Sequence, residues 1–394
     1  MDAARKQIMR ILRTKKYLIV SITLLLAWVA MTYVPLLINN RIVRLFSDYD
    51  DRAVYFKIGR WLIENTYPIG EYPQIPAYLF GINRLFSIWS PANWQVVVFS
   101  AVVSLEMLMV LFLVFKLLSE LLPARLSHYA YLLLLPPVLY FTYCRFDILP
   151  AYFCLLAYSA TTKRHWGMVS ILLAVATFTK WYPALVFPGF FLYASKLEEK
   201  FQWKMILFFV LTSLSILLLS FLHGGLDAIL APYQFHLKRS MEYVALPVLL
   251  NDFLHGLNTP WFFALLFAIQ IVVPLTILFI KIDSLEPLIH YCIMVIGTFM
   301  LLSRIWSPQW FLWLLPFLLL SAKDSKIVWF IAVYCLMNYL NYPILFDYAG
   351  SASLLLKFSS LLTYLMLFGL ILRSAKNLKF ENNLALLNLK NISH

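Results

Sequence analysis

The chain has 394 residues, of which 62% are hydrophobic, 17% aromatic and only 13% charged. Soluble domains carry about 25% charged residues, and a soluble core of this size could not hide so much apolar surface, so the composition excludes a soluble protein. The formal net charge of +13 is explained by loops that lie on an anionic membrane leaflet, and it implies no nucleic-acid partner. We predict an all-α polytopic integral membrane protein.

One membrane span needs about 20 apolar residues, so the chain has room for about 12 spans, within a range of about 10 to 13. The basic segment 1–16 is expected to form a cytoplasmic interfacial helix or to anchor the first span by charge alone. Residues 17–373 then form a single transmembrane domain, and 374–394 a cytoplasmic tail. The expected spans are 17–38, 94–115, 129–143, 148–161, 166–179, 183–194, 205–222, 261–280, 288–302, 310–321, 327–340 and 351–372.

The distribution of charge predicts the orientation of these spans. If the N-terminus is cytoplasmic, 20 of the 32 Lys and Arg residues fall on the inner side, as the positive-inside rule requires. Both termini are then cytoplasmic. The acids are biased the other way: ten of the 19 lie on or near the outer side. Two long outer loops, 39–93 and 223–260, are therefore expected to carry the function.

The first outer loop contains a predicted helix over 51–64. Its apolar positions, Ile58 and Trp61 among them, recur at helical spacing, and Arg52, Lys57 and Arg60 fall opposite. This pattern is typical of a helix that lies flat among lipid headgroups.

Polar residues gather where the expected spans meet the outer side. An ionisable group at membrane depth costs about 2.5–3.5 kcal/mol, so such groups mark a function by default. Cations of this kind can hold a lipid-linked phosphate as a leaving group, and one carboxylate can accept the proton of an incoming hydroxyl. The candidate residues are Asp48, Asp50, Asp51, Glu71, Tyr72, Arg145, Asp147, Lys180, His236, Arg239, Glu242, Arg304, Gln309 and Trp310.

The same residues carry a resemblance to a known family. The blocks occur in order over roughly 45–320, and they are Asp51–Tyr55, Glu71–Pro73, Arg145–Ala151, Lys180–Pro183, His236–Glu242 and Ser307–Pro316. Together they resemble the GT-C superfamily of polyprenyl-phosphate-sugar-dependent glycosyltransferases, and most closely its glycosyltransferase 87 branch of α-mannosyltransferases.

The resemblance implies a GT-C-type helical fold with a catalytic aspartate in the first outer loop. That aspartate falls on Asp51, followed by the aromatic Tyr55, with Asp50 and Asp48 as alternatives. The implied reaction transfers a hexose, mannose above all, with inversion from a polyprenyl-phosphate donor to a lipid or glycan acceptor, in the synthesis of cell-envelope glycolipids. Lys180, Arg239 and Arg304 are candidates for the donor phosphate. No cofactor is required, and a divalent metal is possible but not favoured.

Other interpretations stay open at this point. The aspartates could cap a helix, Arg145 and Asp147 could form an ion pair that orients two spans, and Lys180 could extend to the headgroups. His236, Arg239 and Glu242, spaced three apart, could share one face of a surface helix. The whole chain could also transport lipid-linked sugars without making bonds, or serve as a structural subunit.

Overall fold

The computed structural model describes residues 2–38, 47–48, 50–64, 70–240, 242, 244–254, 260–350 and 352–381, except the side chains of 2–13, 50, 64, 253, 254 and 260. Within these ranges the chain is helical, and its only β pairing is an isolated bridge between Ile280 and Phe380. The α-helices are α1 (Asp2–Leu37), α2 (Asp50–Glu64), α3 (Gln74–Ser87), α4 (Gln95–Leu121), α5 (Pro136–Cys144), α6 (Ile148–Thr162), α7 (Trp166–Thr179), α8 (Pro183–Leu197), α9 (Trp203–Lys238), α10 (Leu246–Leu254), α11 (Pro260–Leu275), α12 (Leu285–Leu302), α13 (Phe311–Ser321), α14 (Ser325–Tyr339), α15 (Phe346–Ala349) and α16 (Leu354–Lys376). Shorter 3-10 helices cover Ser127–Leu134, Thr276–Phe279 and Pro308–Trp310, and a π-helix covers Leu340–Leu345.

Seven helical segments of the described chain are long and apolar enough to cross a membrane. They are Thr14–Leu37, Gln95–Leu121, Trp203–Lys238, Trp261–Phe279, Leu285–Leu302, Ser325–Ala349 and Leu354–Lys376. Four shorter apolar helices cover Ile148–Thr162, Trp166–Thr179, Pro183–Leu197 and Pro308–Ser321. The structure thus agrees with an all-helical, membrane-embedded protein, whereas the number of about 12 spans and their sidedness stay predictions.

Three segments differ from the sequence-based expectation. The expected span 129–143 is broken into a 3-10 helix and α5, which begins at Pro136, because proline cannot donate to the preceding turn. The expected loop 223–260 begins inside α9, which continues to Lys238 through a kink where Gly225 takes φ 66°. The basic segment 1–16 and the first span form one continuous helix, α1.

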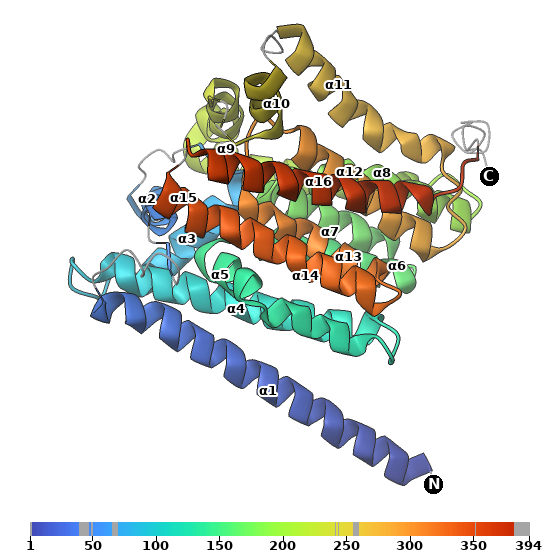
Figure 1. Ribbon diagram of the computed structural model, residues 1–394, viewed down its shortest axis with the longest axis horizontal. Coiled ribbons are helices and arrows are strands. Elements are labelled where there is room, and N and C mark those ends of the chain that lie inside the picture. The colour runs from blue at the N-terminus through green and yellow to red at the C-terminus, as the bar shows by residue number, and fades with distance from the viewer. Residues whose placement is uncertain are drawn as a thin grey trace.

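The short helices α6, α7 and α13 lie near the middle of the bundle in Figure 1, and the longer α1 and α11 lie along its lower and upper edges. Nearly every side chain of α13 is buried, and this helix packs on α4, α6, α12 and α14. A helix that is apolar all round lies either in a protein core or in lipid, and α13 lies in the core. By contrast, only 11% of the most apolar 18-residue stretch of α9 is buried inside the protein, and only 17% of the corresponding stretch of Trp261–Phe279. This is expected of helices that face lipid.

The two ends of the bundle differ in what they carry. The N-terminal end of α1 and the C-terminal end of α16 lie at one end, on the right in Figure 1, whereas α2, α3 and α15 lie at the other. Contacts at the first end include the Lys16 ammonium on the Ser127 carbonyl at 3.1 Å and the Lys196–Glu381 ion pair at 2.9 Å. The polar residues that the sequence singled out gather at the second end, which we call the α2 end.

Two glycines bring α2 and α3 into close contact. A Cβ at Gly59 would lie 2.6 Å from the backbone oxygen of Phe80, and one at Gly81 would lie 2.4 Å from Cβ of Leu62. Any side chain at these positions would force the helices apart. The helix pair therefore forms a fixed platform next to the N-terminal half of α4, and Asp51 stands at the start of its first helix.

Candidate active site

Three functional side chains stand where central helices begin or end. Arg145 follows α5 in extended conformation, and Asp147 precedes α6. Lys180 ends α7 in the same extended conformation, and α8 begins three residues later at Pro183. Proline is favoured in the first turn of a helix because its missing N–H would have no partner there. The local sequence thus ends each helix at the point where its polar residue is placed.

Arg145 joins two aspartates of the first outer segment. Its Nη2 lies 2.8 Å from Oδ2 of Asp48, and its Nη1 lies 2.7 Å from Oδ2 of Asp51. The two carboxylates differ in access, because the Asp48 side chain is 8% exposed and that of Asp51 is 36% exposed. The Tyr342 hydroxyl also donates to Asp48. Asp48 is therefore held within the protein, whereas Asp51 can meet a ligand.

A second buried pair lies beside the first. The Lys180 ammonium is 3.5 Å from Oδ1 of Asp147, whose side chain is 1% exposed, and the indole of Trp313 donates to the same oxygen at 2.9 Å. Nζ of Lys180 also lies 4.7 Å from the ring centres of both Tyr72 and Phe146. The ammonium is thus held by one carboxylate and two aromatic faces, and 14% of the Lys180 side chain stays exposed.

A third group connects the loop after α9 with the Glu71 turn. Arg239 lies 2.6 Å from the carboxylate of Glu242 and 3.9 Å from that of Glu71. The imidazole of His236 is within hydrogen-bond distance, 2.8 Å, of the Glu71 carbonyl. Arg304 donates to the His236 carbonyl, and no carboxylate of the described chain lies within ion-pair distance of it.

Burial raises the pKa of three acids in these groups. It raises the pKa of the Asp51 carboxyl above the ordinary range of an aspartate; Arg145 and Lys180 lower that pKa, and the charge of Asp48 raises it. The pKa values of Glu71 and Glu242 are also raised, mainly by burial. A carboxylate with a raised pKa is a better proton acceptor near neutral pH.

Most of the predicted site residues come together at the α2 end, with four qualifications. Helix α9 ends at Lys238 and Arg239 is extended, so the alternative in which His236, Arg239 and Glu242 share one helix face is wrong. Gln309 lies in the 3-10 turn, and its side chain forms no hydrogen bond with the charged groups within the described ranges. Trp310, in the same turn, stacks on Trp313 with 4.7 Å between ring centroids. The side chain of Asp50 lies outside the described residues.

The structure adds two residues that sequence reasoning missed. Tyr342 donates to Asp48, and the guanidinium of Arg145 lies 5.8 Å from its ring; the only signal was a polar Asn-Tyr-Pro break in a long apolar stretch. Arg52 was expected on the polar face of its helix, but its side chain is 1% exposed, and no residue of the described ranges forms a hydrogen bond with its nitrogens. It lies 5.7 Å from the Tyr143 ring instead. The position in the helix alone could not show that this face also packs against protein.

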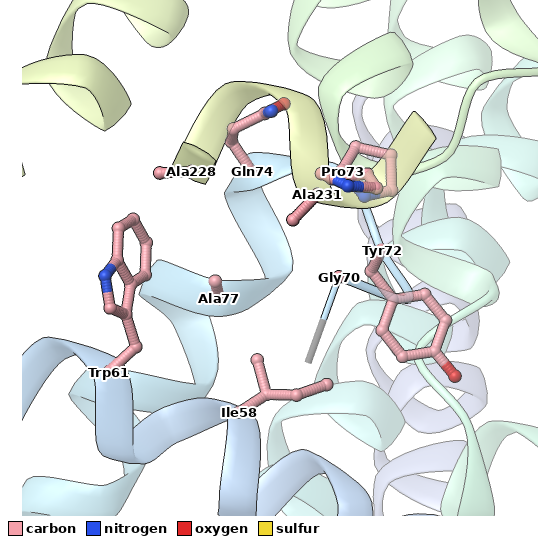
Figure 2. A pocket seen from close by; sticks show the side chains of 10 residues that line it. Ile58, Trp61, Gly70, Tyr72, Pro73, Gln74, Ala77, Ala228 and Ala231 are labelled. Atoms are coloured by element: carbon pink, nitrogen blue, oxygen red, sulfur yellow. The ribbon is translucent and has the colours of Figure 1, made fainter. Parts of the chain in front are cut away.

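An open pocket borders the charged groups at Tyr72. The space between its walls is about 330 Å³ when open solvent is counted, and the enclosed part has room for only about one water-sized molecule. Figure 2 shows side chains of α2, α3 and the second half of α9 around it. The lining is mainly apolar and comprises Ile58, Trp61, Gly70, Tyr72, Pro73, Gln74, Ala77, Ala228, Ala231 and Pro232. Among the described residues, no group of three His, Cys, Asp or Glu side chains is placed to hold a metal ion.

Comparison with known proteins adds no assignment. No protein-family model matches the chain, and no curated protein is significantly similar to it.

Proposed function

We propose that the chain is a membrane glycosyltransferase that moves a hexose from a polyprenyl-phosphate donor to a hydroxyl of a lipid or glycan acceptor. One observation carries the proposal: the partly open carboxylate of Asp51 is held by the buried Arg145, and Lys180 is near enough to lower its pKa. A base and cations in one place are what this reaction needs, because the leaving group is a phosphate that requires no general acid. The resemblance of the sequence blocks to GT-C enzymes points to the same reaction.

In the proposed reaction Asp51 accepts the proton of the acceptor hydroxyl, and the oxygen attacks the anomeric carbon from the face opposite the phosphate. The new C–O bond forms as the bond from the anomeric carbon to the phosphate oxygen breaks. The electron pair stays on the polyprenyl phosphate, and inversion follows from the single displacement. Arg145 fixes the orientation of Asp51, and the buried Asp48 and Tyr342 fix Arg145.

Two cations are best placed to receive the donor phosphate. Arg304 is exposed and has no carboxylate partner in the described part of the chain, so a phosphate does not have to displace an acid from it. Lys180 keeps an open edge beside Tyr72. The apolar surface around the pocket at Tyr72 is the side from which the isoprene chain would approach, because hydrocarbon binds against apolar surroundings. The phosphate would then lie between that pocket and Asp51.

The proposal places the α2 end outside the cytoplasm, with both termini inside. Lys16, Lys196 and Lys323 make their contacts at the opposite end, and cytoplasmic loops are those rich in Lys and Arg.

The test is transfer of labelled mannose from polyprenyl phosphomannose by purified protein in nanodiscs, with endogenous-type glycolipid extract as acceptor. Asp51→Asn is expected to lower kcat by about 10²–10⁴-fold, the usual contribution of a general base. Asp252→Asn is the matched control, because its side chain is 37% exposed, against 36% for Asp51, and it pairs with Lys357 away from the site. Full transfer by Asp51→Asn would refute the mechanism. Movement of the donor across a vesicle membrane, without any glycosylated product, would show that the protein transports lipid-linked sugars and does not transfer the hexose.

A further inference from the structure

Helix α9 is divided into two halves, 203–223 and 226–238, by a pair of glycines. Gly224 has φ −139° and ψ 16°, and Gly225 has φ 66° and ψ −162°. Residues with a Cβ rarely adopt the conformation of Gly225, and no residue of the described chain lies within 4 Å of the position that a Cβ would take there. The hydrogen-bond ladder that stiffens a helix is interrupted at such a break. The two glycines therefore form a hinge between the halves.

The two halves of α9 are held in different ways. Residues 203–223 form a helix about 30 Å long, which matches the hydrocarbon core of a bilayer, about 30 Å thick. Phe209 of this half packs on Phe187 of α8, with 4.4 Å between the ring centroids. The first half is thus fixed by the bilayer and by the bundle. The second half begins where the hydrocarbon core ends, and only its Ala228 and Pro232 are buried.

The second half of α9 stands between the lipid and the candidate site. Four apolar residues recur on one of its faces at helical spacing and are 37–77% exposed: Leu226, Leu230, Tyr233 and Leu237. An apolar stripe on a short helix at the membrane surface lies among the headgroups. Its other face lies over the α2–α3 pair, where Ala228 and Ala231 line one side of the pocket at Tyr72 and Ala77 lines the other (Figure 2).

Contacts near its C-terminal end hold the second half over the charged groups. The Tyr233 ring stacks on Trp181 with 5.3 Å between the ring centroids. The His236 imidazole lies 2.8 Å from the Glu71 carbonyl, and Arg304 donates to the His236 carbonyl. All of these contacts are made by side chains at one end of the segment, so they can break while the rest of the bundle stays packed.

The pocket under this segment is closed. Its enclosed part has room for only about one water-sized molecule, so an isoprenoid chain cannot enter while both walls stay in place. The α2–α3 wall is fixed, because a Cβ at Gly59 or at Gly81 would already lie within 2.6 Å of the neighbouring helix. The wall that can move is therefore the second half of α9, on its glycine hinge.

We propose that residues 226–238 form a gate that turns on Gly224 and Gly225 and admits a lipid with an anionic phosphate head from the membrane to the charged groups. The proposal rests on the proposed function, since this lipid is the donor that Lys180 and Arg304 receive. Closure of the gate over the bound donor would also keep water away from the anomeric carbon, as lids do in other enzymes.

The test measures how fast a thiol under the gate is modified, so it does not depend on turnover. The four native cysteines are buried, so Ala228→Cys and Ala77→Cys each add the thiol that a water-soluble maleimide can reach when the gate opens. In full-length protein in nanodiscs, Gly225→Ala is expected to speed the labelling of Ala228→Cys about tenfold, because alanine disfavours the closed backbone conformation. Gly350→Ala is the matched control, since Gly350 also has a positive φ, 88°, but lies outside α9; a change of less than about twofold is expected.

A second variant opens the gate without changing its backbone. Tyr233→Leu removes the stack on Trp181 and should speed the labelling of Ala228→Cys about threefold, whereas Tyr233→Phe keeps the ring and should leave the rate unchanged. Ala245→Cys reports any general loosening, because Ala245 is 0% exposed and lies beside Glu242, outside the gate. Its labelling should stay slow in every variant.

Farnesyl phosphate is the probe for the lipid that the gate admits. At about ten times its Kd it should slow the labelling of Ala228→Cys and Ala77→Cys about tenfold, because the bound chain covers both walls of the pocket. Inorganic phosphate at the same concentration should have no effect. Equal protection by inorganic phosphate, or none by farnesyl phosphate, would overturn the assignment of a lipid to the gate.

The outcomes distinguish the gate from the proposed function. Labelling of Ala228→Cys that stays equal with and without Gly225→Ala and Tyr233→Leu would overturn the gate, even if transfer still depends on Asp51. Labelling that rises in both variants and falls with farnesyl phosphate would support the gate even if no transfer is found. A parallel rise at Ala245→Cys would show that the whole α2 end loosens, and it would also overturn the proposal.

Discussion

Replacing Arg145 tests whether one buried cation supports both the stability and the chemistry of the site. Arg145→Met removes a guanidinium that pairs with Asp48 at 2.8 Å and with Asp51 at 2.7 Å. Methionine keeps much of the side-chain volume, so the charge is the main thing lost. The Asp48 carboxylate, 8% exposed, then loses its ion pair with Arg145 and keeps the hydrogen bond from the Tyr342 hydroxyl.

The expected loss of unfolding free energy in Arg145→Met follows from the exposures of Asp48 and Asp51. Removing one partner of a buried ion pair costs about 3–5 kcal/mol, because an unpaired charge stays buried. The Tyr342 hydroxyl still solvates Asp48, so we expect the lower end, about 3 kcal/mol. Asp51 adds little, because an ion pair that is a third exposed is screened by water. The free energy of unfolding is measured by SDS titration in mixed micelles.

Asp48→Asn in the Arg145→Met background is the control. Neutralising the Asp48 carboxylate should restore a large part of the lost unfolding free energy. A coupling of about 1–3 kcal/mol between the two substitutions is expected in the double-mutant cycle. Additive effects of the two substitutions would show that Arg145 and Asp48 do not act on each other as a pair.

The pH dependence of transfer gives a second readout. Burial already raises the pKa of Asp51, and Arg145 lowers it, so Arg145→Met should raise this pKa further. The base acts only when ionised; therefore activity is lost as pH falls through the pKa of Asp51, and the acidic limb of kcat/KM should move to higher pH. An acidic limb that stays in place, together with a loss of stability under about 1 kcal/mol, would refute this account of Arg145.

Two further predictions concern the surroundings of the site. Gly59→Ala should destabilise the protein by about 1–3 kcal/mol, since its Cβ would lie 2.6 Å from the Phe80 oxygen. Gly369→Ala is the control, because a Cβ at Gly369 would have its nearest atom at 3.9 Å, and it should change the unfolding free energy by less than about 0.5 kcal/mol. Equal effects of the two substitutions in the SDS titration would contradict the close packing of α2 on α3. Tyr342→Phe should lower the free energy of unfolding by about 1–2 kcal/mol in the same titration, because it removes the hydroxyl that donates to Asp48. It should also slow transfer without changing the KM for the donor. A raised donor KM would instead show that Tyr342 contacts the substrate.

The amino-acid sequence by itself determined the class of the protein and the identity of most polar residues at the α2 end. An apolar content of 62% and only 13% charge require lipid as the solvent, and this conclusion needs no tertiary information. A charge beside a long apolar run is equally visible along the chain, which is why Arg145, Asp147 and Lys180 could be named. The turn chemistry of prolines such as Pro183 explains why these residues stand at helix ends.

The tertiary structure decided which of these residues touch and which of them are open. Tyr342 and Asp48 are 294 residues apart in sequence, and no local pattern encodes their contact. The same holds for Arg52, whose polar position on its own helix gave no sign of its burial. Local spacing fixes which face of a helix a residue occupies, but burial depends on what packs against that face, and this is set by segments far away in the chain. For that reason the sequence left three aspartates as candidates for the base, whereas the packing around Arg145 leaves Asp51 partly open and encloses Asp48.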